Sequence, residues 1–276
     1  MAHLIQQNGS VQVKAFSIPA PNGTVSGIET GDGPPVVLLA GLGSTTRIWG
    51  NLPAVLGRSF RVIAVDNRGV GGSKDGGSFS FAKAAEDLAA VLEGRGLDRA
   101  ALLGASMGGV IALHAAITHP DMISQLVIAS SAPRLTTYGR RMLELLHDLL
   151  LYGPPERAGA ALMTLAFAPS FHERHGGFVN DVEKLYGPNE ADVPGTLLQV
   201  DHLLGGWDLS EWLPSVEAPS LVLYGDHDPV VSPDETKELA AGLPSAELVK
   251  VPGAAHSVLA EGGEPILQRV TDFLAR

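Results

Sequence analysis

Short apolar runs recur along the chain, and longer stretches that mix apolar and polar residues separate them. Most of the runs are continuous rather than alternating, which is typical of strands that are covered on both faces. Apolar residues keep a helical spacing between several runs, as over 81–92 and 266–274. The continuous runs are 36–40, 62–65, 100–103, 126–129, 221–224 and 248–251. Strands that alternate with helices in this way predict an α/β fold, with a mostly parallel sheet and helices on both of its faces.

Two local signals add detail to this picture. Ser232-Pro-Asp-Glu235 has the form of a capping box with proline at the first helical position, and Gly242 ends the predicted helix. Near the N-terminus, residues 11–18 and 24–29 alternate more strongly between apolar and polar positions. We therefore expect an antiparallel hairpin ahead of the first parallel strand.

The alternation of strands and helices stops between about Pro133 and Pro214. Helical and proline-punctuated segments dominate there, and the apolar residues of 142–150 make a wide helical face. We interpret residues 134–214 as a helical cap (lid) inserted between two strands of one core domain, which consists of 1–133 and 215–276. A chain of 276 residues is long enough to bury a large core without disulfides.

Composition narrows the classes of function. The formal net charge is −11, cysteine is absent, and no run of basic residues occurs. The negative net charge disfavours binding to the phosphate backbones of nucleic acids and to anionic lipid. The absence of cysteine excludes disulfides, thiolate metal sites and a cysteine nucleophile. The sequence has neither the pattern of a signal peptide nor an apolar run long enough to cross a membrane. We expect a cytoplasmic protein that acts on a small molecule and has no nucleic-acid or membrane partner. Whether the protein forms a homo-oligomer stays open.

One serine stands where a nucleophile would. Gly104-Ala-Ser106-Met-Gly108 fits the pattern G-x-S-x-G, directly after a strand run and directly before a helix of small residues. A serine on such a tight strand-to-helix turn projects its hydroxyl outward, and the two glycines relieve crowding. An ordinary glycine-rich turn is the alternative. We predict that Ser106 is a nucleophile because the strand and the helix both flank it as the motif requires.

A serine nucleophile needs a base, and the base needs a carboxylate that fixes its tautomer. On this kind of turn the chain order is serine, acid, histidine. His256 follows the last apolar run, and Asp226 and Asp228 follow the run before it. Carboxyl ends of parallel strands are where open sheets place their sites. We predict His256 as the base, and position alone leaves both aspartates open as the acid.

Backbone amides are the expected stabilisers of the oxyanion. The candidates are the N–H groups of Met107, directly after the serine, and of Leu42, in the loop after the first parallel strand. That loop also resembles the start of a dinucleotide fingerprint, with Asp66 at the ribose position, but Thr46 stands where the third glycine belongs. Phosphate-loop and metal-ligand spacings are missing. We expect no cofactor and no metal.

Together these motifs resemble the α/β-hydrolase superfamily, within it the capped serine hydrolases of the carboxylesterase, 3-oxoadipate enol-lactonase and cofactor-free haloperoxidase group. The resemblance implies an eight-stranded, mostly parallel sheet and a catalytic triad of Ser106, Asp228 and His256. A serine at this turn argues against relatives that use an aspartate nucleophile. The matching segments are 40–43, 66–73, 104–109, 218–228 and 253–256.

Two positions depart from the pattern of that group. Relatives often have His-Gly before the oxyanion residue, where this chain has Ala40-Gly41. They also often have a glutamate five residues after the histidine and a proline two residues later; Glu261 fits, but the proline is delayed to Pro265. Both departures concern residues around the triad rather than the triad itself.

The resemblance implies hydrolysis of carboxylic esters of small to medium hydrophobic substrates through an acyl-enzyme on Ser106. Enol-lactone hydrolysis, carbon–carbon bond hydrolysis and perhydrolysis would use the same triad. A ligand-binding receptor and a nicotinamide oxidoreductase are alternatives from other classes. Aromatic residues near or in the cap are candidates to line the substrate pocket, with ordinary packing as the alternative for each: Trp49, Phe167, His202, Trp207 and Trp212.

Overall fold

A single eight-stranded sheet forms the centre of the computed structural model, which describes residues 12–21, 23–74, 77–186 and 190–276. The strands run in the order β1-β2-β4-β3-β5-β6-β7-β8. β2 pairs antiparallel with β1 and β4, and all other neighbours are parallel. The strands are β1 (Lys14–Ala20), β2 (Gly23–Thr30), β3 (Pro35–Leu39), β4 (Arg61–Val65), β5 (Ala100–Ala105), β6 (Ile123–Ala129), β7 (Ser220–Gly225) and β8 (Ala246–Val251). The predicted α/β fold and its mostly parallel sheet are confirmed.

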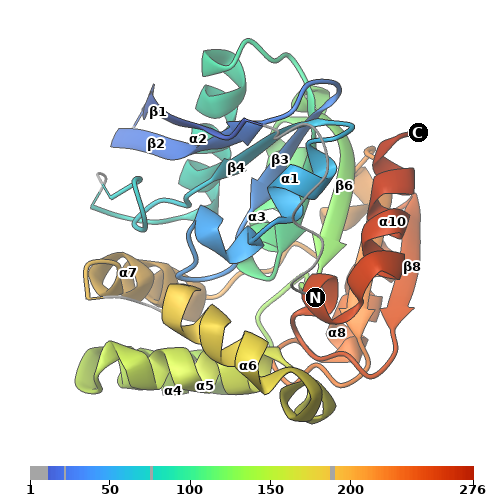
Figure 1. Cartoon of the computed structure of the whole chain (residues 1–276). Helices are drawn as coiled ribbons and strands as arrows, with labels where there is room; N and C mark the ends of the chain where they lie inside the picture. The colour runs from blue at the N-terminus through green and yellow to red at the C-terminus, as the bar shows by residue number, and fades with distance from the viewer. Residues whose placement is uncertain (1–11, 22, 75–76, 187–189) are drawn as a thin grey trace.

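Helices connect the strands and cover both faces of the sheet (Figure 1). The α-helices are α1 (Leu52–Leu56), α2 (Phe81–Gly94), α3 (Met107–Thr118), α4 (Thr137–Tyr152), α5 (Pro155–Ala166), α6 (Pro169–Tyr186), α7 (Val193–Leu204), α8 (Pro233–Gly242), α9 (Val258–Glu261) and α10 (Gly263–Leu274). The described residues also form three short 3-10 helices, η1 (Thr46–Trp49), η2 (Pro120–Met122) and η3 (Leu213–Ser215). Within the described residues, no helix is long and apolar enough to cross a membrane.

The continuous apolar runs have a structural reason in this arrangement. Successive side chains of a strand point to opposite faces, so a strand covered on both faces needs apolar residues at every position. In β4, Ile63 and Val65 pack in the cluster of α2, α3 and α8, while Val62 and Ala64 pack in the cluster of α1 and α10. The sheet therefore lies between two apolar layers.

The two local signals are borne out where the structure describes them. β1 and β2 form the antiparallel hairpin, with Lys14 paired to Glu29, and residue 11 lies outside the described residues. At the start of α8 the backbone N–H of Ser232 donates to Glu235 Oε2 at 2.7 Å, and Glu235 N–H donates back to Ser232 Oγ at 3.4 Å. Both donors at the helix terminus are satisfied by this reciprocal pair.

Helices α4 to α7 lie between β6 and β7 in the chain, and Figure 1 shows them together at the end of the sheet to which the arrow of β6 points. The two ends of this segment meet. Leu135 N–H donates to Trp207 O at 3.0 Å, and Leu209 N–H donates to Pro133 O at 2.9 Å. The chain thus leaves and re-enters the region of the sheet at one place. The division into a core of 1–133 and 215–276 and a cap of 134–214 stays a prediction.

The turn between β5 and α3 leaves no room for side chains at its glycines. Ser106 has φ 53° and ψ −120°, a left-handed conformation that is unusual for a residue other than glycine. A Cβ atom on Gly104 would lie 2.3 Å from Gly108 O, and one on Gly108 would lie 1.9 Å from Leu39 O. Both glycines are required because the start of α3 packs directly on the backbone of β3 and β5.

This crowding predicts the effect of one methyl group. Gly108→Ala should lower the free energy of unfolding by about 1–3 kcal/mol or more, because backbone atoms must move to accept it. Gly177→Ala in α6 is the matched control, since a Cβ there meets no atom within 4 Å, and it should be neutral or stabilising. Urea unfolding of both variants checks this. Equal stability of the two variants would contradict the packing described for the turn.

Candidate active site

The three residues predicted as a triad follow strands β5, β7 and β8, at the carboxyl edge of the sheet. His256 Nδ1 lies 2.8 Å from Asp228 Oδ2, and the side chains are 16% and 1% exposed. The other oxygen, Asp228 Oδ1, accepts the N–H groups of Val230 at 2.8 Å and Val231 at 3.0 Å. Bonds to both oxygens hold the carboxylate, and the carboxylate in turn fixes the orientation of the imidazole.

The neighbouring aspartate does something else. Asp226 Oδ1 accepts the N–H of Gly253 at 2.6 Å, and Asp226 Oδ2 lies 3.8 Å from Lys250 Nζ. Asp226 therefore ties the loop after β7 to the end of β8. Position alone leaves both aspartates open and the resemblance implies Asp228; in the structure Asp228 is the one in contact with the histidine.

The environment of His256 favours its charged form. Burial disfavours the imidazolium, but the charge and hydrogen bond of Asp228 and the charge of Glu261 outweigh it, so the pKa of His256 is raised above its ordinary value of 6.5. Because Nδ1 is engaged with Asp228, the second ring nitrogen, Nε2, is the one left for proton transfer.

The loop after β3 lies against the serine. A Cβ on Gly41 would be 3.4 Å from Ser106 Cβ and 3.9 Å from Ser106 Oγ. Leu42 is the next residue in this loop. On the other side, Met107 is the first residue of α3, so its N–H has no acceptor within the helix. The two amides predicted to stabilise an oxyanion thus belong to segments that adjoin Ser106.

A glutamine that the sequence did not single out holds this loop. Gln199 in α7 is fully buried, its Oε1 accepts the N–H of Gly43 at 2.8 Å, and its Nε2 donates to Arg68 O at 2.8 Å. It therefore joins the loop after β3, the loop after β4 and a helix of the predicted cap. No sequence motif indicates that a lone polar residue in a helical segment holds two loops by hydrogen bonds.

Asp66, the residue that completed the partial dinucleotide pattern, has its carboxylate engaged with backbone. Its Oδ1 accepts the N–H of Thr46 at 2.6 Å, and its Oδ2 accepts the N–H of Gly72 at 2.9 Å. A Cβ on Gly71 would lie 2.1 Å from Asp66 Oδ2. The side chain organises the loops after β3 and β4, and the glycine beside it permits this close approach.

The aromatic candidates for a substrate pocket are placed differently from one another. Trp49 is 8% exposed and packs with α1, whereas Trp212 is 57% exposed. Phe167 is stacked on Phe171 with ring centroids 5.2 Å apart.

His202 and Trp207 both pack edge-on against Phe81, with centroid distances of 4.9 and 5.9 Å. His202 Nε2 also accepts the N–H of Phe81 at 3.3 Å. The structure thus gives these two side chains a packing role at the start of α2. Contact with substrate stays a prediction for each of the five aromatic candidates.

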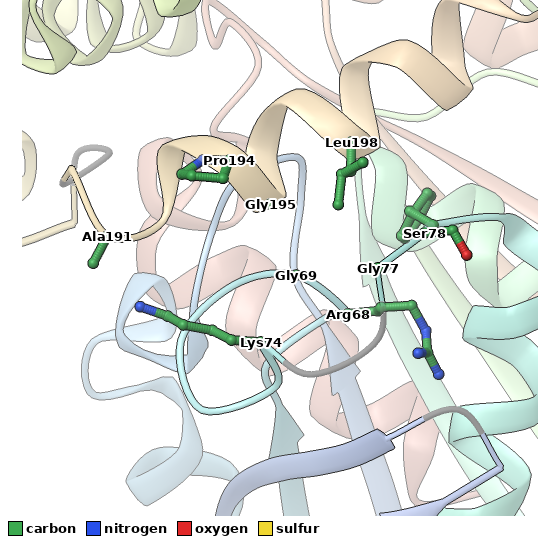
Figure 2. A pocket seen from close by; sticks show the side chains of 10 residues that line it. Arg68, Gly69, Lys74, Gly77, Ser78, Ala191, Pro194, Gly195 and Leu198 are labelled. Carbon is green, nitrogen blue, oxygen red and sulfur yellow. The ribbon is translucent and has the colours of Figure 1, made fainter.

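A small cavity of about 160 Å³ lies between the loop after β4 and helix α7 (Figure 2). None of the residues predicted for catalysis lines it. Lys74, a partly exposed residue of its lining, has its Nζ 3.1 Å from Asp192 Oδ1. The lining residues are Arg68, Gly69, Lys74, Gly77, Ser78, Phe79, Ala191, Pro194, Gly195 and Leu198. In the part of the chain that the structure describes, no group of three or more histidine and carboxylate side chains could hold a metal ion.

Solved structures share this fold at low sequence identity. An enol-lactonase from Burkholderia xenovorans LB400 matches with a TM-score of 0.86 and 22% identity, over 95% of this chain and 100% of its own. A thermophilic esterase from Thermogutta terrifontis matches with a TM-score of 0.85 and 23% identity, over 95% and 98% of the two chains. At these identities the likeness establishes the fold.

The sequence is also similar to a named relative and to a family of proteins. A protein of Serratia proteamaculans (strain 568) named "Putative carbamate hydrolase RutD" is 29% identical over 238 residues, which cover 85% of this chain and 88% of the relative. The model of a family described as "Alpha/beta hydrolase family" matches residues 36–268. Because this match spans far more than half of the chain, the protein belongs to the alpha/beta hydrolase family and is an enzyme of that superfamily.

Proposed function

We propose that the protein is a serine hydrolase that cleaves carboxylic esters of small to medium hydrophobic substrates through an acyl-enzyme on Ser106. The observation that carries the proposal is the 2.8 Å contact between His256 Nδ1 and Asp228 Oδ2, at the same edge of the sheet as the strained turn of Ser106. Strain at one residue beside an oriented imidazole is an arrangement that nucleophilic catalysis uses.

The proposed reaction begins when His256 Nε2 takes the proton of Ser106 Oγ as the oxygen attacks the ester carbonyl. The carbonyl electrons move to oxygen, where the N–H groups of Met107 and Leu42 donate to the oxyanion. The imidazolium, stabilised by Asp228, then gives its proton to the leaving alkoxide, and the alcohol departs. A water molecule attacks the acyl-enzyme with His256 as base, and the acid is released as Ser106 regains its proton.

Apolar packing around the oxyanion loop supports a hydrophobic substrate. Leu42 packs against the apolar cluster of α4, α5 and α7, to which Leu146, Leu150 and Val200 belong. The carbonyl group of the substrate would therefore be flanked by an apolar surface on the side of the predicted cap. Apolar surface of this kind favours hydrocarbon over charged acyl or alcohol groups.

Carbamate hydrolysis is a second candidate, favoured by the name that the Serratia proteamaculans relative carries. A carbamate presents a carbonyl carbon that the same serine hydroxyl can attack, with the same amides as oxyanion donors. In a carbamate the carbonyl carbon is bonded to a nitrogen, whereas in a carboxylic ester it is bonded to a carbon at that position. The pocket must therefore accept a different group beside the carbonyl. Relative rates on matched ester and carbamate substrates separate them.

Hydrolysis of p-nitrophenyl esters from acetate to laurate, with the corresponding carbamate in parallel, tests the proposal. Ser106→Ala should lower turnover by a factor on the order of 10⁶, because the attacking oxygen is removed. Ser245→Ala, an exposed serine in the loop before β8, is the control and should keep full activity. Ester turnover that survives Ser106→Ala unchanged would refute the proposal, and a faster carbamate reaction would favour the second candidate.

The raised pKa of His256 predicts the pH dependence of the reaction. The base must be neutral to accept the serine proton, so kcat/KM should rise with pH along a limb whose midpoint lies above 6.5. Initial rates measured between pH 5 and 9 give the midpoint of this limb. A midpoint below 6.5 would contradict the electrostatic environment described for the histidine.

The carboxylate of Asp228 predicts a separate effect on rate. Asp228→Asn should lower kcat by about 10⁴-fold, as expected when the imidazole loses its orienting carboxylate.

The position of Gln199 predicts an effect on rate from inside the molecule. Gln199→Leu removes the hydrogen bonds that Gln199 makes with the N–H of Gly43 and the carbonyl of Arg68, so the loop that carries Leu42 should lose its fixed position. We expect kcat to fall about 10- to 100-fold, with a smaller change in KM. Gln125→Leu removes a glutamine that donates to Phe273 O and serves as the control. Equal kcat values for the two variants would be the contrary result.

A further inference from the structure

Glu261 joins the loop of the histidine to the helices of the predicted cap. Its Oε1 accepts the N–H of Ala255 at 2.8 Å, and its Oε2 accepts the N–H of Ala168 at 3.0 Å. Ala255 directly precedes His256, and Ala168 lies in the short junction between α5 and α6. One carboxylate at the end of α9 therefore bridges two segments that are far apart in the sequence.

A second contact closes the bridge. The N–H of Ser257, directly after His256, donates to Ala166 O at 2.7 Å. Both neighbours of the histidine are thus bonded to residues 166–168, one directly and one through Glu261. Ala168 is 0% exposed and Ala255 is 1% exposed, so water cannot replace these bonds without an opening of the structure.

The bridge also carries charge. Burial raises the pKa of Glu261 above its ordinary value of 4.5, and the two backbone hydrogen bonds offset only part of this rise. The charge of Asp228 raises the pKa of Glu261, and the charge of His172 in α6 lowers it. Glu261 in turn raises the pKa of His256. In its ionised form Glu261 adds to Asp228 in favouring the imidazolium form of His256.

We propose that Glu261 is a positioning residue that locks His256 to the 166–168 junction, so that the base is correctly placed only when this part of the predicted cap is seated. The proposal rests on the proposed function in one respect, the role of His256 as the base. Glu261 itself touches no reacting atom in this scheme. Its carboxylate acts through the backbone of Ala255, directly before the histidine, while Ser257 on the other side bonds to Ala166 without it.

The chemistry of the bridge specifies the variant that tests it. A glutamine has the same shape but one acceptor oxygen, so Glu261→Gln must leave either Ala255 N–H or Ala168 N–H facing an N–H donor. An unsatisfied buried donor is costly, so the junction should open more often. Glu264→Gln is the matched control, because it removes the same charge at an exposed position three residues later.

Two measurements on the full chain report on the bridge without any substrate. NMR titration of the His256 ring should show its midpoint at lower pH in Glu261→Gln than in wild type, and unchanged in Glu264→Gln. Hydrogen exchange of the Ala168 and Ala255 amides should be about tenfold faster or more in Glu261→Gln. Where ester turnover is present, kcat should fall about tenfold with KM nearly constant.

Glu261→Asp keeps the charge on a shorter stem and decides the matter if Glu261→Gln does not fold. It should leave the midpoint of His256 close to the wild-type value while the Ala168 amide exchanges faster. Exchange rates and a histidine midpoint that match the wild type in Glu261→Gln, or exchange unchanged in Glu261→Asp, would overturn the proposal. Absence of Ser106-dependent turnover in wild type would instead refute the proposed function and leave the bridge measurements valid.

Discussion

The backbone of Ser106 is the constraint on which the rest of the candidate site depends. At φ 53° it turns the chain from β5 into α3 within one residue, and it does so where Gly108 packs on the carbonyl of Leu39. This contact seats the start of α3 against β3, and the loop after β3 then passes beside the serine at Gly41. A strained residue persists only where its surroundings over-determine it, and here two strands and a helix do so.

Two loops of the candidate site are held by helices outside the sheet. Gln199 of α7 fixes the loop that carries Leu42, and Glu261 fixes the loop of His256 to the junction between α5 and α6. Helices of the predicted cap therefore also organise loops at the edge of the sheet. In the proposed reaction, the sheet and the predicted cap together preorganise the oxyanion donors and the base.

Features set by residues close together in the sequence can be predicted from its pattern, whereas contacts between residues far apart in the sequence cannot. Continuous apolar runs and Ser232-Pro-Asp-Glu235 are local, and the strands and the capping box follow from them. Position along the chain does not separate Asp226 from Asp228, because both follow β7; the resemblance implies Asp228, and the fold brings the carboxylate of Asp228 to the histidine. The role of Gln199 could not be predicted, because its contacts join residues far apart in the sequence. His202 and Trp207 show a further limit, since aromatic residues that pack on Phe81 and residues that line a pocket have the same pattern in a sequence.

Covalent labelling tests whether Ser106 is a nucleophile activated by His256, as we propose. The wild-type chain is incubated with a p-nitrophenyl alkylphosphonate, and intact mass followed by peptide mapping locates the adduct. We predict a single adduct on Ser106, with labelling lost in Ser106→Ala and strongly slowed in His256→Ala. A wild-type chain that acquires no adduct, or one that carries it on another residue, would contradict the role of Ser106 as the nucleophile.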